Sequence, residues 1–338
     1  MNSNRRMVRD DEKRVILFLH MAGVALQGAG LAMVFILPFL ARRRFEAENW
    51  QSWVLTAAMP VMQFFTIFWN HLYARIPSWL YLVIIAVLSC IPVALMAFAQ
   101  SMTLLMICLV VAAFGGAGGG AGLSPINADL LRNCYRDRVR GRVYGMITAS
   151  QFFGVIVAGW IMGRWSDLDP DGYRFFLPLT AASLATGLFL FALISRTDVF
   201  RRRPRPVVET GQQWWTPLRD MGRILRADHR FAAYETAFMS YGVGWMICTA
   251  LVPLLAKDKL DLDYGQFSRS TIIAFQFTMI LMLVPMGRLA DRVGAVRLAA
   301  GSFLWLTLYP LGLLFVPVGS EVWLGVLTML YALGMTGV

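Results

Sequence analysis

Four glutamines lie in the middle of long apolar stretches of the sequence: Gln27, Gln63, Gln151 and Gln276. A primary amide is costly in an apolar environment when it lacks a hydrogen-bond partner, so such side chains usually face protein groups or water. One role open to them is hydrogen bonding between packed helices, which contributes about 0.6–2 kcal/mol each. Four amides at a similar depth favour the other role, a polar binding site for a small solute.

Aromatic residues recur at helical spacing in the apolar stretch 231–256. Tyr234, Phe238, Tyr241 and Trp245 stand at positions i, i+4, i+7 and i+11, which places them on one face of a helix. Such stripes usually serve packing. Tyr241 and Trp245 lie near the middle of the stretch, where their rings could instead stack on a bound solute. We therefore include both as candidate binding residues.

Ionisable groups inside the apolar stretches are few. His20, Asp129 and Glu235 are the main ones, and His20 corresponds to Glu235 at the repeat offset of 215 residues described below. All three are expected near the membrane surface, where polar side chains are common. Proton or ion coupling through His20 or Glu235 is the alternative to this interfacial role, and the coupling ion is unknown.

No arrangement for covalent chemistry is visible in the sequence. The four cysteines are scattered singly, without the spacing of a zinc site or a disulfide framework. No nucleophile, base and orienting group converge. We therefore expect no enzyme activity, no metal and no other cofactor.

The elements that must position these residues are transmembrane helices. The chain of 338 residues is 58% hydrophobic and 15% charged, and its apolar residues form long runs. A soluble domain has about 25% charged residues, and a membrane span needs about 20 apolar ones. The predicted fold class is therefore an all-α integral membrane protein. The ten predicted spans cover residues 14–41, 51–73, 77–98, 102–131, 142–163, 174–195, 231–256, 267–286, 296–316 and 322–338.

Basic residues are distributed unevenly between the spans. With the N-terminus on the inner side, 23 of the 31 Lys and Arg residues fall on that side and eight on the other. This bias predicts a cytoplasmic N-terminus in a membrane of the bacterial inner or plasma-membrane type. It also explains the net charge of +11 without a nucleic-acid partner. The expected partners of this monomer are the lipid bilayer and a small-molecule solute.

The sequence resembles itself at an offset of about 215 residues. The segment PFLARRR at 38–44 corresponds to PLLAKDK at 253–259. Two repeated groups of helices are typical of secondary transporters. The repeat predicts an N-terminal six-helix half at 1–195, a cytoplasmic linker at 196–229 and a C-terminal half at 230–338. Because helices 1–4 correspond to helices 7–10, we expect the chain to be truncated within helix 10, with helices 11 and 12 missing.

Two motifs carry a resemblance to a known family. The segment 287–297, GRLADRVGAVR, resembles the loop signature G-x-L-A-D-R-x-G-R-[RK] of the major facilitator superfamily and departs from it at 295–296. The stretches around Asp129 and Arg142 resemble the junction of helices 4 and 5 in that family. The resemblance implies two six-helix halves that move a small solute by alternating access, in secondary active or facilitative transport.

A non-transporting membrane sensor or assembly protein on the same fold is the alternative. The first-half copy of the loop motif is degenerate, with Ala74 in the aspartate position and Pro77 in that of the second glycine. This degeneracy favours the alternative, because the intact motif belongs to transporters.

The loop motif also predicts a gate formed by Gly287, Asp291, Arg292 and Gly294. Gly294 would allow a tight turn between two helices. Asp291 would cap the N-terminus of the fifth span across the two halves, because helix N-termini carry partial positive charge and unpaired N–H groups. The same aspartate could alternatively be a solvated turn residue.

Overall fold

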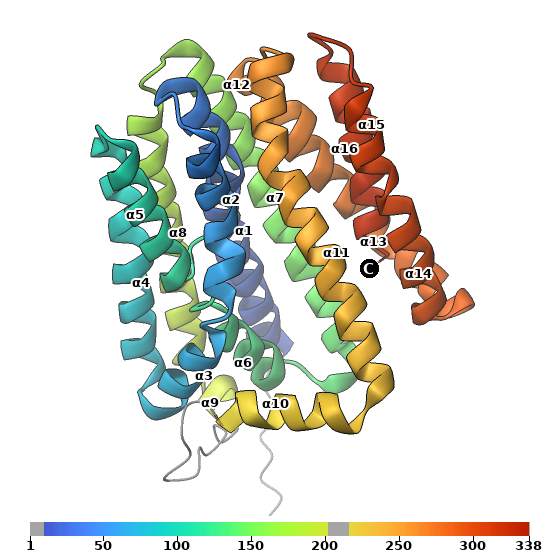
Figure 1. Cartoon of the computed structure of the whole chain (residues 1–338). Coiled ribbons are helices and arrows are strands. Elements are labelled where there is room, and N and C mark those ends of the chain that lie inside the picture. Colours follow the sequence, from blue (N-terminus) through green and yellow to red (C-terminus); the bar gives the residue numbers. More distant parts are fainter. Residues whose placement is uncertain (1–9, 202–215, 338) are drawn as a thin grey trace, which may run out of the picture.

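The computed structural model describes residues 10–201 and 216–337, and the described part consists of helices and connecting turns (Figure 1). The N-terminal half contains α1 (Asp10–Arg44), α2 (Asn49–Gln63), α3 (Thr66–Arg75), α4 (Ser78–Leu95), η1 (Met96–Phe98), α5 (Met102–Gly115), α6 (Ser124–Cys134), α7 (Asp137–Leu168) and α8 (Tyr173–Ser195). The predicted linker contains α9 (Asp198–Arg201) and α10 (Thr216–Ala227), and its residues 202–215 lie outside the described part. The C-terminal half contains α11 (His229–Leu254), η2 (Leu255–Lys259), α12 (Tyr264–Phe267), η3 (Ser268–Ile273), α13 (Ala274–Val293), α14 (Ala295–Leu306), α15 (Leu308–Leu314) and α16 (Glu321–Met335).

Helices occupy all ten predicted spans. Within the described residues, seven helices are long and apolar enough to cross a membrane, and the pair α2 and α3 supplies an eighth span that is bent by 45°. The remaining two spans contain α5 and α16, which are apolar but shorter, with 14 and 15 residues. The predicted fold class, an all-α membrane protein, is confirmed.

The second and fourth spans are broken, whereas the sequence predicted one continuous helix for each. The second bends between α2 and α3, and the fourth unwinds between α5 and α6. Gly116, Gly118 and Gly119 have φ values of 115°, 71° and 86°, in the left-handed region that favours glycine. The two breaks meet, because the side-chain amide of Gln63 donates a hydrogen bond to the Gly119 carbonyl oxygen at 3.0 Å.

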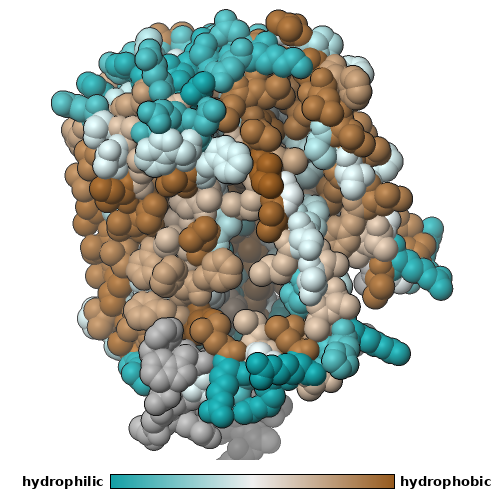
Figure 2. Space-filling model, viewed as in Figure 1, coloured by the Kyte–Doolittle hydropathy of each residue, from teal (hydrophilic) through white to brown (hydrophobic). Residues whose placement is uncertain are grey.

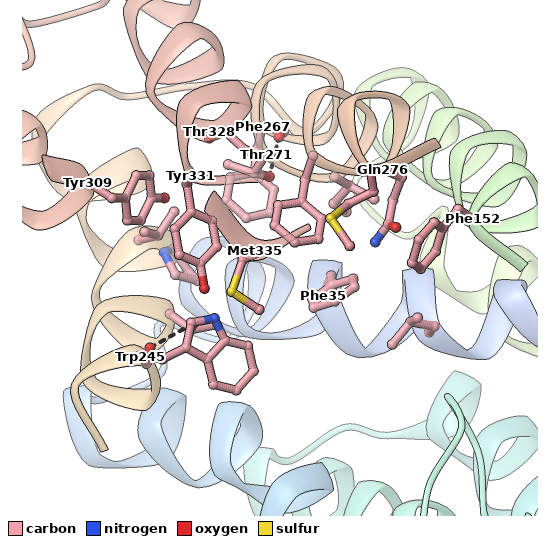
Figure 3. A pocket seen from close by; sticks show the side chains of 17 residues that line it. Phe35, Phe152, Trp245, Phe267, Thr271, Gln276, Tyr309, Thr328, Tyr331 and Met335 are labelled. Atoms are coloured by element: carbon pink, nitrogen blue, oxygen red, sulfur yellow. Dashed lines mark hydrogen bonds between the residues drawn. The ribbon is translucent and has the colours of Figure 1, made fainter. Parts of the chain in front are cut away.

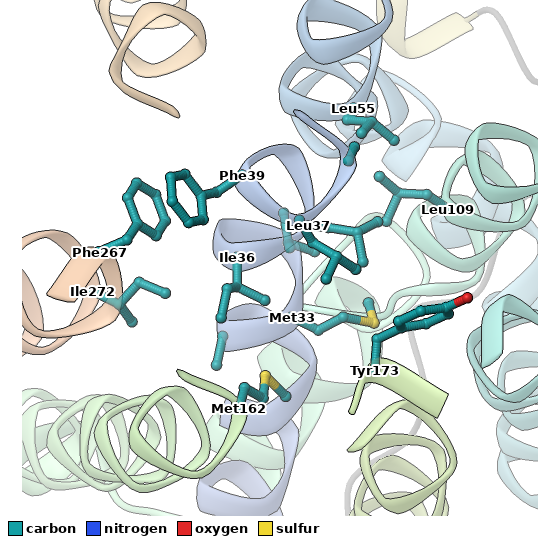
Figure 4. Close-up of a cluster of buried hydrophobic side chains, with 14 of the residues drawn as sticks. Met33, Ile36, Leu37, Phe39, Leu55, Leu109, Met162, Tyr173, Phe267 and Ile272 are labelled. Carbon is teal, nitrogen blue, oxygen red and sulfur yellow. The ribbon is translucent and has the colours of Figure 1, made fainter. Parts of the chain in front are cut away.

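Helix α1 is buried at the centre of the N-terminal half. Met33, Ile36 and Leu37 are completely buried, in a cluster with side chains of α2, α5, α7 and α8 (Figure 4). Helix α7 approaches α1 closely at Gly154, where an added Cβ would collide with the carbonyl oxygen of Ala25. The core of this half is therefore organised around α1.

The two halves meet at one end of the bundle and stand apart at the other (Figure 1). We call the end where α1 terminates the closed end, and the opposite end, which α10 crosses, the open end. At the open end, a Cβ added to Gly141 or Gly145 of α7, or to Gly287 or Gly294 of α13 and its turn, would find nothing within 4 Å. The surface is hollowed between the halves toward this end (Figure 2).

Candidate functional site

A cavity of about 270 Å³ lies between the two halves. The N-terminal half contributes Leu31 and Phe35 of α1 and Phe152 of α7, and the C-terminal half contributes residues of α11, α12, η3, α13, α15 and α16 (Figure 3). Ligand sites in proteins are typically apolar cavities of about 300–1,000 Å³ with a few polar groups. The volume and position suit a small solute held between the halves.

Gln276 is the amide that the cavity contains. It lies near the start of α13, is 1% exposed, and points toward Phe35 and Phe152 of the other half (Figure 3). Its Oε1 atom has no hydrogen-bond partner among the described residues. A buried acceptor without a partner costs about 1–3 kcal/mol, so a donor that reaches this enclosed oxygen when a solute binds would stabilise the complex.

Of the two predicted aromatic residues, Trp245 lines the cavity directly and Tyr241 stands behind its wall. Trp245 is half-buried on α11. The Tyr241 hydroxyl donates to the sulfur of Met335, a cavity residue, at 2.6 Å, and its ring centroid lies 5.0 Å from that of Phe303. Tyr241 therefore supports the wall through Met335.

The structure places Gln27 outside this cavity. Its amide nitrogen donates to the carbonyl oxygen of Leu184 at 2.9 Å, and the residue is 2% exposed. An added Cβ on Gly187 would lie 2.7 Å from the same nitrogen. Gln27 thus joins α1 to α8 inside the N-terminal half, which is the packing role that the sequence left open.

Gln63 and Gln151 come together at the break of the fourth span. Gln63 donates to Gly119 and accepts a hydrogen bond from the Thr66 hydroxyl at 3.2 Å. The Nε2 atom of Gln151 would lie 3.6 Å from a Cβ placed on Gly119. Both glutamines are half-buried, so the four predicted amides belong to three separate places rather than to one site.

His20 and Asp129 are both partnered in the interior of the N-terminal half. His20 is 1% exposed, with its Nδ1 atom 3.1 Å from the Tyr135 hydroxyl and its ring edge-to-face with Phe191. Asp129 accepts a hydrogen bond from the buried Tyr73 hydroxyl at 2.7 Å. This bond ties α6 to α3 on the open-end side of the two broken spans.

The predicted contact of Asp291 with the N-terminus of the fifth span is not formed in this structure. Gly294 has a φ of 89° and joins α13 to α14 by a tight turn, as predicted. The Asp291 side chain is exposed and forms no hydrogen bond or ion pair with another described residue. The two halves are separated at the open end in this structure. The cap that Asp291 is expected to form therefore stays a prediction for the state in which this end is closed. The remaining gate and coupling candidates are Gly287, Arg292 and Arg142, which are exposed, and Glu235, which is half-buried near the open end of α11.

Polar contacts that we did not predict hold the closed end together. Arg42 forms two hydrogen bonds with Asp258, and Arg43 pairs with Asp263 at 3.1 Å. These contacts join the end of α1 to the segment after α11. A signal was present in the repeat, because Arg43 and Asp258 occupy corresponding positions with opposite charge.

Apolar and backbone contacts between the halves accompany these ion pairs. The ring of Phe39 stacks on that of Phe267 with centroids 4.2 Å apart. The Ser268 hydroxyl donates to the carbonyl oxygen of Gly159 at 2.7 Å. The contact between the halves therefore extends from the closed end toward the cavity.

Comparison with known proteins supports the resemblance seen in the loop motifs. The Major Facilitator Superfamily profile matches residues 15–338, and no curated protein matches the chain. Among solved structures, the nucleoside transporter NupG is similar with a TM-score of 0.69 and 16% identity, over 96% of this chain and 79% of NupG. A bacterial homologue of the human lysosomal transporter Spinster, inward-facing and unoccupied, has a TM-score of 0.66 and 13% identity, over 96% and 74% of the two chains. A POT family transporter in complex with 5-aminolevulinic acid has a TM-score of 0.67 and 11% identity, over 97% and 82%.

At these identities the solved structures establish the fold. The family match adds more, because it extends over the helices of both halves and includes the loop motif at 287–297. The chain therefore belongs to the major facilitator superfamily and is a membrane solute transporter.

Proposed function

We propose that this transporter moves a small uncharged solute by alternating access, with the closed end outside the cell and the open end inside. A rocking motion of one half against the other would expose the cavity beside Gln276 to each side in turn. This orientation is supported by the basic residues, because the predicted topology assigns 23 of the 31 Lys and Arg residues to the inner side.

The uneven distribution of contacts between the halves carries this proposal. Arg42 and Arg43 bind aspartates of the other half at the closed end, whereas Gly145 and Gly294 have no neighbour within 4 Å of an added Cβ at the open end. Two halves that rock must break contacts at one end as they form contacts at the other. Asp291, exposed at the open end, is the group that we expect to form a contact when that end closes.

Glu235 is the better of the two candidates for proton coupling. His20 is enclosed in the N-terminal core and partnered by Tyr135, while Glu235 is half-buried on α11, which lines the space between the halves. Uptake of solute into proteoliposomes with and without a proton gradient tests this point. Coupling that survives the Glu235→Gln substitution would exclude this residue.

A reducible cross-link across the closed end tests alternating access without a known solute. Cysteines that replace Arg42 and Asp258 join the two halves, and a third cysteine at Thr271 reports on access to the cavity. With the link in place, a membrane-impermeant maleimide should label Thr271→Cys only from the open end. Reduction of the link should restore labelling from both sides.

A matched control is available at the same end. Arg44 and Asp171 also form an ion pair, at 3.0 Å, but both belong to the N-terminal half. A cross-link between cysteines at these two positions should leave labelling unchanged. Labelling from the closed-end side that persists with the Arg42–Asp258 link would refute alternating access.

A further inference from the structure

The unpartnered oxygen of Gln276 has no potential donor among the hydroxyl groups of the three threonines in the cavity wall. Each of these threonines already donates its hydroxyl proton to the backbone of its own helix: Thr249 to Trp245 at 2.9 Å, Thr271 to Phe267 at 2.6 Å and Thr328 to Leu324 at 2.9 Å. Trp245, Tyr309 and Tyr331 also line the cavity, and none of them donates to this oxygen; the Tyr331 hydroxyl is itself buried without a partner. The Gln276 oxygen is therefore unpartnered in this structure, and a bound solute can supply the donor.

The walls around this amide are flat and aromatic. Tyr309 and Tyr331 lie with ring centroids 4.5 Å apart at one side, and Phe275 lies 5.6 Å from Tyr331. Phe35 and Phe152 of the other half stand beside Gln276 (Figure 3). Aromatic walls bind flat rings well, because offset or edge-to-face contacts add to the area that is buried.

The lining contains no Asp, Glu, Lys, Arg or His among its 17 residues. A charged solute would lose its hydration here without gaining an opposite charge, which is costly in an apolar environment. The cavity therefore selects against ions and zwitterions.

We infer that this cavity binds an uncharged, planar ring compound that carries an amide or lactam N–H group, and that Gln276 recognises this group. A glutamine amide offers a donor and an acceptor side by side, and it can form two parallel hydrogen bonds with an edge that presents the complementary pair. The inference rests on the proposed function and specifies its solute class. A lipid tail would fill the apolar walls but leave the Gln276 oxygen without a donor.

Calorimetric titration of the purified full chain tests the inference with pairs of probes that differ in one group. Nicotinamide, benzamide and uracil have the predicted ring and N–H donor. Nicotinate replaces the amide by a carboxylate, and 1,3-dimethyluracil keeps the ring and both carbonyls but lacks N–H. We expect the first three to bind, and the last two to bind at least about tenfold more weakly than their partners.

Two substitutions identify the amide that is responsible. Gln276→Leu should weaken nicotinamide binding at least about tenfold, because both hydrogen bonds of the amide are lost. Gln27→Leu is the matched control, since it removes an equally buried amide that bonds to Leu184 outside the cavity. It should leave nicotinamide binding unchanged.

Three results would overturn the inference. They are equal affinity of the Gln276→Leu variant and the unchanged protein for nicotinamide, equal affinity of the protein for nicotinate and nicotinamide, or no binding of nicotinamide, benzamide or uracil. The cross-linking experiment needs no solute. The cross-linking result can therefore support alternating access even when the titration excludes the proposed solute class, so failures of the two proposals are distinguishable.

Discussion

Arg42 of α1 and Asp258 of η2 form two parallel hydrogen bonds that join the two halves, with Nε–Oδ1 and Nη2–Oδ2 distances of 3.1 and 2.8 Å. The geometry is bidentate, which is the strong form of an arginine–carboxylate pair. Both side chains are nevertheless partly exposed, at 25% and 48%, so the pair contributes no more than about 1 kcal/mol. A gate built from such pairs can open under thermal motion.

Removing this pair should therefore favour opening of the closed end. We expect Arg42→Ala to increase labelling of a cysteine at Thr271 from the closed-end side by up to about fivefold, which corresponds to about 1 kcal/mol. The exchanged double variant Arg42→Asp with Asp258→Arg should restore the original rate. Unchanged labelling in Arg42→Ala would show that the pair does not hold the gate.

Asp291→Asn should shift the conformational equilibrium toward the state in which the two halves are separated at the open end. A carboxylate at a helix N-terminus contributes about 0.3–1 kcal/mol when exposed and up to about 2 kcal/mol when partly buried, and the substitution removes the charge but keeps the shape. We expect labelling of a cysteine at Ser124 to increase by up to about tenfold. An unchanged rate in a well-inserted variant would identify Asp291 as a turn residue only.

Tyr73→Phe should destabilise the protein by about 1–3 kcal/mol. The substitution leaves the Asp129 carboxylate, which is 7% exposed, without the hydroxyl that donates to it at 2.7 Å. Thermal unfolding in detergent measures the effect. Tyr144→Phe removes a hydroxyl from a residue that is 57% exposed and should leave the melting temperature unchanged.

Gly154→Ala should disrupt the packing of α7 on α1. Its new methyl group would collide with the carbonyl oxygen of Ala25, which belongs to a backbone that cannot yield easily. Gly145→Ala on the same helix meets nothing within 4 Å and should be neutral or stabilise the helix by up to about 1 kcal/mol. Equal yields of folded protein for the two variants would contradict this account.

The number and placement of the helices could be predicted because bilayer thickness sets the length of an apolar run. The breaks could not, since Gly116, Gly118 and Gly119 also suit close packing of a continuous helix, and only the backbone angles distinguish the two. An apolar run reports that a helix crosses the membrane but does not report where it bends.

The candidate site was predictable only in part, for a geometric reason. Trp245 and Gln276 were expected to bind solute and do line one cavity. Gln27 was grouped with Gln276 because it lies at a similar depth. Helix α1 is enclosed on several sides, so depth alone does not decide which neighbour a side chain faces, and Gln27 faces Leu184 of α8. The closed-end pairs depend in the same way on how the two halves meet: the repeat places opposite charges at Arg43 and Asp258, but it does not give the partner of each residue.

The two halves differ in the continuity of corresponding helices. Helix α13 runs without a break from Ala274 to Val293, whereas its counterpart in the first half is divided into α2 and α3. Because the Tyr73–Asp129 bond joins α3 to α6, we expect these two short helices to move together, with the contact of Gln63 with Gly119 as the hinge. Closure of the open end would then involve a bend within the N-terminal half as well as a rotation of one half against the other.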